Sequence, residues 1–389
     1  MKVLNICVKV GCGKNSLAVV LFCAFAAMTG ASGQCSNNTS WAEFHRHDMI
    51  RFNPCETVLK VSNVADLGMK WSFTVSKLFI VYSSPAVMDG YLFVGSTANN
   101  NGLYAVNANT GAKIWDFTAG DSVFSSPAIA GGIVYFGSSN NSKVYALDAK
   151  TGTPVWTFNA GIYGVNSSPT VVGGVVYIGS NSGYLYALDA KTGTELWSYE
   201  TGETGNGSPA IANGVVYAGG TNNYIYALNA STGSLIWSYY TGANAITSPA
   251  VVDGMVYATA ENGTLYALDA GTGSLIWSAT SSYSFSPAVD YGAVFIGSGD
   301  NNVYALNAKT GATLWSYSTG APVGSTPAVA NGVVYVGSLD YSVYALNART
   351  GAKLWSYATG ARIESSPAVS NGMVYIGSDD GKLYAFGLP

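Results

Sequence analysis

Oxygen-bearing side chains in short loops are the first candidates for chemistry in this sequence. Glu203 and Glu364 are such residues, and Asn166 and Asn206 occupy comparable positions. Carboxylate and amide oxygens are the ligands that hard cations such as calcium prefer. The same side chains equally suit solvated loops, and no two carboxylates stand out as a pair for acid–base chemistry. We therefore predict neither a metal site nor a catalytic residue among them.

The histidines offer a second candidate. His45 and His47 are the only two in the chain, with Glu43 and Asp48 close by. Such a cluster can bind a transition metal, although a surface loop or strand is the simpler interpretation. No histidine follows residue 47 and no cysteine follows residue 55. Catalysis by a histidine-activated serine or cysteine is therefore excluded for the rest of the chain.

A sequence repeat must position the candidate loops. The stretch LYALDAKTGTELW at residues 185–197 recurs six more times, and its tryptophans follow one another at steps of 38 to 41 residues. A period of this size indicates a repeat architecture, in which each copy forms the same supersecondary unit.

Each repeat predicts four strands. Short apolar runs rich in valine and tyrosine are typical of strands. The dipeptide Asn213-Gly214 between two of them is typical of a tight primed hairpin. Asp189 can bond its own backbone two residues on, and Gly193 can take the positive φ that a turn requires. A proline opens the first strand of each of eight units, at positions 85, 127, 169, 209, 249, 287, 327 and 367.

Four antiparallel strands per repeat predict an all-β, eight-bladed β-propeller. The last unit ends before a tryptophan strand, whereas residues 69–75 have such a strand with no unit before it. We expect this N-terminal strand to complete the C-terminal blade and close the ring. Each repeat tryptophan should dock between neighbouring blades with its N–H satisfied. These residues are Trp71, Trp115, Trp156, Trp197, Trp237, Trp277, Trp315 and Trp355.

The residues that fail to repeat are the best candidates for binding. In a propeller, the loops from an outermost strand to the next innermost strand line one mouth of the channel. Variable polar and aromatic side chains on a rigid scaffold are typical of binding sites. The candidates are Tyr82, Phe124, Asn166, Glu203, Asn206, Tyr283, Arg362 and Glu364.

The composition and the N-terminus indicate the compartment. Charged residues make up 10% of the chain and the net charge is −4, which offers no basic surface for nucleic acid. Residues 1–33 have the features of a secretory signal: lysines, a short apolar run at 16–28 and small residues at 31–33. Retention as an uncleaved anchor is the alternative. We predict a secreted or periplasmic monomer with no membrane span after signal removal.

The cysteines fit an oxidising compartment. Removal of the signal leaves Cys35 and Cys55, which bracket a short stretch. We expect a disulfide between them. It would staple an N-terminal segment at residues 34–68, ahead of a propeller at residues 69–389.

The repeat motif resembles a known family. The pattern Ala-x-Asp/Asn-x-x-Thr-Gly-x-x-x-Trp resembles the tryptophan-docking repeat of pyrroloquinoline-quinone (PQQ) β-propellers, over roughly residues 69–389. Trp41, Phe44 and Asp48, followed by Glu56-Thr57, also resemble the N-terminus of secreted bacterial proteins with these repeats. By size and blade number the chain is similar to BamB-like periplasmic proteins, which implies a scaffold in outer-membrane assembly. The chain departs from that group in one respect. A lipobox has a small residue before its cysteine, whereas Gln34 precedes Cys35 here.

The resemblance also raises the possibility of an enzyme. PQQ dehydrogenases of this fold share a vicinal Cys-Cys disulfide over the quinone, a tryptophan beneath it and oxygen ligands for calcium. Here residues 69–389 contain no cysteine, and every tryptophan except Trp41 has a docking position. We therefore expect no cofactor; PQQ with calcium belongs only to the dehydrogenase alternative.

Fold alone does not determine function. We predict a non-enzymatic scaffold that binds a protein or polysaccharide partner in the cell envelope. One alternative is a PQQ-dependent alcohol dehydrogenase with a degenerate site. The other is a carbohydrate-binding or surface adhesion module, since a tyrosine-rich rim can stack against sugar rings.

Overall fold

The computed structural model describes residues 40–42, 51–75, 80–97, 102–202, 207–245, 247–282 and 285–389. The chain divides into residues 1–36 and a compact unit of residues 37–389, and the account below concerns the second. Among the described residues, no helix has the length and apolarity needed to cross a membrane. The predictions that lie outside the described residues concern the signal at 1–33, Cys35, His45, His47, Glu203, Asn206 and Tyr283.

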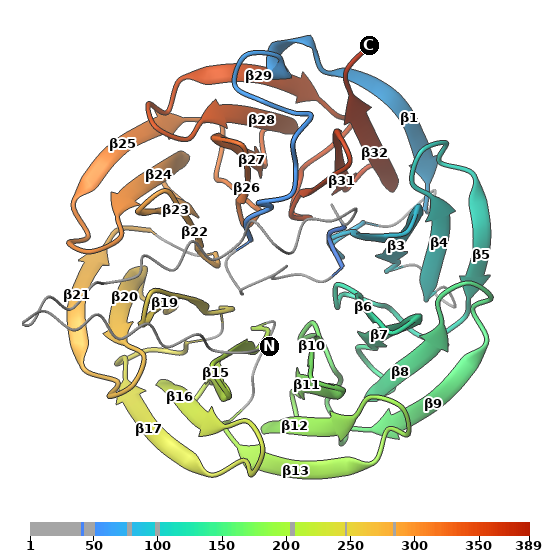
Figure 1. Ribbon diagram of the computed structural model, residues 1–389, viewed down its shortest axis with the longest axis vertical. Coiled ribbons are helices and arrows are strands. Elements are labelled where there is room, and N and C mark those ends of the chain that lie inside the picture. Colours follow the sequence, from blue (N-terminus) through green and yellow to red (C-terminus); the bar gives the residue numbers. More distant parts are fainter. Residues whose placement is uncertain are drawn as a thin grey trace, which may run out of the picture. The chain divides into compact units, whose positions relative to one another are not determined.

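The described residues of this unit form eight four-stranded antiparallel sheets, arranged as blades around an axis (Figure 1). This confirms the predicted eight-bladed β-propeller. The innermost strands of neighbouring blades contact one another in a closed circle. Their short length, three residues each, suits the crowded position next to the axis.

The strands fall into four concentric sets. The innermost strands are β2 (Ala86–Met88), β6 (Ala128–Ala130), β10 (Thr170–Val172), β14 (Ala210–Ala212), β18 (Ala250–Val252), β22 (Ala288–Asp290), β26 (Ala328–Ala330) and β30 (Ala368–Ser370). The second strands are β3 (Tyr91–Gly95), β7 (Ile133–Gly137), β11 (Val175–Gly179), β15 (Val215–Gly219), β19 (Met255–Thr259), β23 (Ala293–Gly297), β27 (Val333–Gly337) and β31 (Met373–Ser378). The third strands are β4 (Leu103–Asn107), β8 (Lys143–Asp148), β12 (Tyr184–Asp189), β16 (Tyr224–Asn229), β20 (Thr264–Asp269), β24 (Asn302–Asn307), β28 (Ser342–Asn347) and β32 (Lys382–Gly387). The outermost strands are β1 (Gly68–Thr74), β5 (Lys113–Phe117), β9 (Pro154–Asn159), β13 (Glu195–Glu200), β17 (Leu235–Tyr240), β21 (Leu275–Thr280), β25 (Thr313–Ser318) and β29 (Lys353–Ala358), and a 3-10 turn, η2 (Val64–Asp66), precedes β1.

The turn residues adopt the conformations that their types predict. Asn213 and Gly214 have φ values of 51° and 77°, as a primed two-residue hairpin requires. Asp189 Oδ1 accepts hydrogen bonds from the N–H groups of Lys191 and Thr192, at 3.0 and 2.8 Å. Local side-chain bonding of this kind sets the turn between the third and fourth strands of the blade.

The ring closes with strands from both ends of the chain. β1 pairs antiparallel with β32, so the sheet order of this blade is β1-β32-β31-β30. In Figure 1 the blue β1 lies beside the dark red β32. The predicted closure is therefore correct, and the third strand of this blade does not remain an open sheet edge.

Each repeat tryptophan links its blade to the next. The indole N–H of Trp197 donates to Ala230 O at 2.9 Å, and Trp355 closes the ring by donating to Leu67 O at 2.8 Å. The other six donate in the same way, at 2.9 to 3.1 Å. Bonding the one polar group of a large apolar side chain makes it suited to a joint between sheets.

The glycine of the repeat fits against the tryptophan of the preceding blade. Gly193 has a φ of 72°, and a Cβ atom there would lie 2.6 Å from Cδ2 of Trp156. Glycine is therefore required twice, for the turn and for the close approach of the indole.

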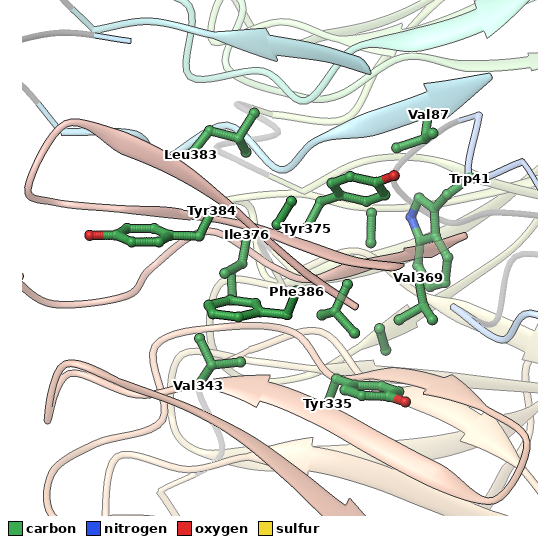
Figure 2. Close-up of a cluster of buried hydrophobic side chains, with 14 of the residues drawn as sticks. Trp41, Val87, Tyr335, Val343, Val369, Tyr375, Ile376, Leu383, Tyr384 and Phe386 are labelled. Carbon is green, nitrogen blue, oxygen red and sulfur yellow. The ribbon is translucent and has the colours of Figure 1, made fainter. Parts of the chain in front are cut away.

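The largest buried apolar cluster lies at the seam between the chain ends. Figure 2 shows Trp41, Val87, Tyr335, Tyr375 and Phe386 in this cluster, where Trp41 is an N-terminal residue and Phe386 a C-terminal one. Packing between segments so distant in sequence ties both ends into one core.

Tyr335 is an exception among the tyrosines of the second strands. Tyr177, for example, donates its hydroxyl to Ala230 O at 3.1 Å, the same oxygen that receives the Trp197 N–H. The corresponding alanine is missing at the seam, because the fourth strand of the last blade comes from the N-terminus. The Tyr335 hydroxyl is buried and has no partner among the described residues.

We expect Tyr335→Phe to leave the free energy of unfolding unchanged or to raise it by up to about 1 kcal/mol, because it removes a buried, unsatisfied hydroxyl. Phenylalanine already occupies this position in β3 (Phe93) and β23 (Phe295). The matched control, Tyr177→Phe, should lower the free energy of unfolding by about 1 kcal/mol, since it leaves a carbonyl with one partner fewer. Urea unfolding of the two variants distinguishes these outcomes, and equal losses would contradict the prediction.

Candidate functional site

A ring of hydroxyl groups surrounds the axis where the innermost strands begin. The serine or threonine before each opening proline contributes to it, and we call this set the hydroxyl girdle: Ser84, Ser126, Ser168, Ser208, Ser248, Ser286, Thr326 and Ser366. The Ser84 N–H donates to Ser126 Oγ at 2.9 Å, and the Ser366 N–H donates to Ser84 Oγ at 3.0 Å. Equivalent bonds join further blades around the ring. The girdle therefore serves as a second joint between blades, close to the axis.

The girdle is the wall of a cavity of about 580 Å³, which we call the axial cup. Above the girdle, loops between blades contribute Tyr82, Phe124, Asn166, Thr247, Phe285, Gly324 and Glu364. The Tyr82 and Phe124 rings are neighbours, with centroids 5.4 Å apart. A cavity of this volume lies within the range of small-molecule sites.

The opposite end of the channel is filled by Trp41 and Arg51. The side chain of Trp41 is 0% exposed and that of Arg51 is 1% exposed. The Arg51 guanidinium carbon lies 5.2 Å from the centre of the Trp41 ring. Its Nε and Nη2 donate to Pro327 O and Pro367 O at 2.9 and 2.7 Å, one residue beyond the girdle. Trp41 and Arg51 therefore lie buried in the channel below the girdle.

Main-chain pairing holds this N-terminal segment in place. Trp41 and Val87 of β2 exchange hydrogen bonds of 2.8 and 2.6 Å. Farther along the segment, Phe52 bridges Val329 of β26 in parallel. Among the innermost strands, β2 and β26 thus receive main-chain partners outside their own sheets. Sequence reasoning did not predict this pairing; the one available signal was that Trp41 lies outside the docking repeat.

Four of the predicted binding residues lie together on the wall of the cup. These are Tyr82, Phe124, Asn166 and Glu364. Arg362 is exposed and lies beside Glu364 in sequence, outside the residues that line the cup. Sequence reasoning missed the girdle itself and Phe285. The signal for the girdle was present in the sequence, because a serine or threonine precedes every opening proline.

One sector of the mouth holds two carboxyl groups with altered pKa values. Burial, together with the nearby charge of Glu364, raises the pKa of Asp379 to about 6. Burial also raises the pKa of Glu364, opposed by a hydrogen bond from Tyr82 and by the charge of Arg362. Asp379 Oδ1 is buried and has no hydrogen-bond partner among the described residues. The two carboxyls therefore destabilise each other when both are ionised.

We expect Asp379→Asn to raise the free energy of unfolding at pH 7 by about 1 kcal/mol, a modest gain because solvent screens this half-buried group. The ordinary pKa is 3.8, so between about pH 4 and 6 the folded protein binds more protons than the unfolded chain. Stability from the neutral carboxyl is present below this window and is lost as the pH rises through it. The advantage of the variant should therefore disappear at pH 3.5.

Thermal unfolding at pH 3.5 and pH 7 measures this difference. Glu200→Gln, at an exposed carboxyl on β13, is the control and should stay within about 0.5 kcal/mol of the wild type at both pH values. An equal gain at both pH values would show that the carboxyl charge is not responsible.

The cup does not fit PQQ with calcium. PQQ is a tricarboxylic quinone and needs cationic partners. Among the described residues that line the cup, Glu364 is the one acidic side chain, and none is a lysine, arginine or histidine. No group of three or more His, Cys, Asp or Glu side chains suited to a metal ion occurs in the described part of the chain. We therefore derive no reaction through this cofactor.

Fold and site together define a class: an eight-bladed β-propeller with a hydroxyl-lined axial cup. A family model described as the beta-propeller of the beta-alanine-activating enzyme matches residues 164–388, more than half of the chain. A second model, described as outer membrane protein assembly factor BamB, matches residues 62–208. The chain therefore belongs to the β-propeller family of the first model, and the two matches together identify it as a PQQ-repeat β-propeller. No curated protein matches the sequence significantly.

Solved structures share the fold at low identity. The chain is similar to BamB from Moraxella catarrhalis, at 24% identity over 83% of this chain and 100% of that chain, with a TM-score of 0.71. It is also similar to quinohemoprotein alcohol dehydrogenase from Comamonas testosteroni, at 18% identity over 91% of this chain and 82% of that chain, with a TM-score of 0.78. The computationally designed Ika8 protein aligns at 18% identity over 82% of this chain and 100% of that chain, with a TM-score of 0.70. These neighbours include a designed protein and an enzyme, so the likeness establishes the fold alone.

Proposed function

We propose that this protein is a non-enzymatic β-propeller of the cell envelope or the extracellular space, which binds a protein or polymer through the axial cup and its mouth. The observation that carries the proposal is the contrast between the two levels of the cup. The girdle repeats in every blade, whereas the mouth above it combines aromatic, amide and acidic residues that do not repeat. A uniform scaffold with variable loops is typical of recognition.

Exposed apolar side chains extend this mouth. Ile162 and Tyr163, in the loop between β9 and β10, are 74% and 66% exposed. Large exposed side chains next to a cavity are typical of contact surfaces for a partner. The match to the BamB family model supports a binding role, and the signal-like residues 1–33 support export.

A pull-down from envelope extract of the source organism tests the proposal. The wild-type protein should recover a specific partner, and a double variant, Phe124→Ala with Tyr163→Ala, should recover less of it. Lys191→Ala, on the exposed turn between β12 and β13, is the control and should behave like the wild type. The proposal is wrong if no partner is recovered and a deletion strain keeps a normal envelope composition.

The dehydrogenase alternative has a direct test. Calorimetry with PQQ and calcium should give no binding heat, and dye-linked alcohol oxidation should stay at background. Saturable heat together with oxidation would replace the scaffold proposal with an enzymatic one.

A further inference from the structure

The girdle hydroxyls have hydrogen-bonding capacity left for a ligand. Ser126 Oγ accepts the Ser84 N–H, and Ser168 Oγ accepts the Ser126 N–H. A hydroxyl offers one donor and two acceptor positions, so each of these groups retains its O–H and one lone pair. Seven girdle oxygens accept a hydrogen bond from a neighbouring blade, and within the described residues no bond has a girdle O–H as its donor. The girdle is therefore densely polar, uncharged and incompletely bonded.

Aromatic residues lie on opposite sides of the axis above the girdle. Phe124 belongs to the loop that enters the second blade, and Phe285 to the loop that enters the sixth. In a ring of eight blades these two positions are four blades apart, on opposite sides of the axis. Tyr82 lies beside Phe124, which widens the apolar surface on that side. A ligand on the axis thus meets aromatic surface above and hydroxyl groups below.

Charge narrows the class of ligand. Among the described residues that line the cup there is one acidic side chain, Glu364, and no basic one, so phosphates and carboxylates find no cationic partner there. A simple amine would suit Glu364 but would leave the girdle O–H donors without acceptors. An apolar peptide side chain would remove the girdle from water without replacing its hydrogen bonds, which is costly. A neutral sugar offers apolar C–H faces for the rings and hydroxyls that both donate and accept.

We propose that the axial cup binds the end of a neutral saccharide chain. The inference rests on the proposed binding function and names the ligand class of the same site. The sugar ring would lie between the aromatic groups of Phe124 and Phe285, with its hydroxyls on the girdle, on Asn166 and on the Glu364 carboxylate. Because Trp41 and Arg51 lie buried in the channel below the girdle, the chain would enter from the mouth and terminate in the cup. Recognition of a chain end, and not of an internal stretch, follows from this placement.

A glycan array carrying neutral, acidic and amino glycans tests the ligand class with the purified full-length protein. Neutral glycans should be bound through their free ends. Titration calorimetry with soluble oligosaccharides of the strongest glycan should show affinity that stops rising once the chain extends beyond the cup. A blank array, or binding to acidic glycans alone, would overturn the inference.

Variants locate the site. Phe124→Ala should weaken saccharide binding by roughly tenfold, because it removes an aromatic stacking contact. Glu364→Gln should weaken it less, since the amide keeps one acceptor oxygen. Tyr240→Ala, at an exposed aromatic on β17 that does not line the cup, is the matched control and should bind like the wild type. Unfolding midpoints of all three report whether the fold is retained, and binding that is unchanged in Phe124→Ala would contradict the assignment.

The pull-down separates this inference from the proposed function. A blank array together with a protein partner captured through the mouth would refute the saccharide and leave the scaffold role standing. A blank array and an empty pull-down would refute both.

Discussion

Replacing Trp197 with alanine is expected to lower the free energy of unfolding by about 3–5 kcal/mol, the usual range for a large aromatic removed from a packed site. The indole lies between two blades, and its centroid is 5.9 Å from that of the Tyr177 ring. Its N–H donates to Ala230 O, and the face of the ring meets Gly233 of the next blade, where a Cβ atom would lie 2.7 Å from Cδ2 of Trp197. The truncation removes all of these contacts and leaves a cavity at a joint of the ring.

Chemical unfolding of the wild type and the variant measures the loss. Lys191→Ala is the control, because this side chain is exposed on the turn six residues earlier, and it should change the free energy of unfolding by less than about 0.5 kcal/mol. An unchanged midpoint in Trp197→Ala would show that the tryptophan does not join the blades.

The repeat made the fold predictable. Every copy packs against its neighbours in the same way, so the spacing of Trp197, Asp189 and Gly193 reflects one blade geometry that recurs around the ring. The closure was predictable as well, because β1 and β32 carry complementary fragments of one unit. What repeats in sequence reports contacts that repeat in space.

The candidate site was predictable only in part. Phe124 and Glu364 stood out because they interrupt a regular pattern, and both line the cup. The girdle was missed for the opposite reason, because its serines repeat as regularly as residues that only hold the fold together. In the structure they both join the blades and line the cavity. A residue that repeats can therefore belong to a site on the axis, where equivalent positions from every blade converge.

The burial of Trp41 and Arg51 in the channel was beyond sequence reasoning. Neither residue belongs to a repeat, and the carbonyl groups that Arg51 binds are distant in the chain, because Arg51 is 276 residues from Pro327 and 316 from Pro367. Composition predicts that an arginine lies at the surface unless it is paired. Only the folded ring supplies the carbonyl groups that satisfy this guanidinium.

The same N-terminal segment provides the second large expected effect. Glu56→Ala should lower the free energy of unfolding by about 3–5 kcal/mol, because each buried donor left without its acceptor costs about 1–3 kcal/mol. The Glu56 carboxylate is fully buried. Oε1 accepts the N–H groups of Val58 and Leu59 at 2.7 and 3.1 Å, and Oε2 accepts the Gly372 N–H at 2.9 Å. Alanine leaves these buried donors without their acceptor, and each such loss is costly.

The location of Glu56 makes the effect larger than a local one. Gly372 lies in the hairpin between β30 and β31, in the blade that also contains β1, so the carboxylate fastens the N-terminal segment to the closing blade. The Asn331 side chain reinforces the attachment by donating to Glu56 O and to Leu59 O.

For Glu56→Ala we expect chemical unfolding at a lower midpoint and faster proteolysis within residues 51–67. Glu195→Ala, at an exposed carboxylate on β13, is the control for loss of a glutamate and should stay within about 0.5 kcal/mol of the wild type. If Glu56→Ala kept the wild-type midpoint and proteolysis rate, the segment would be held by Trp41 and Arg51 alone, and the carboxylate would not contribute to closing the ring.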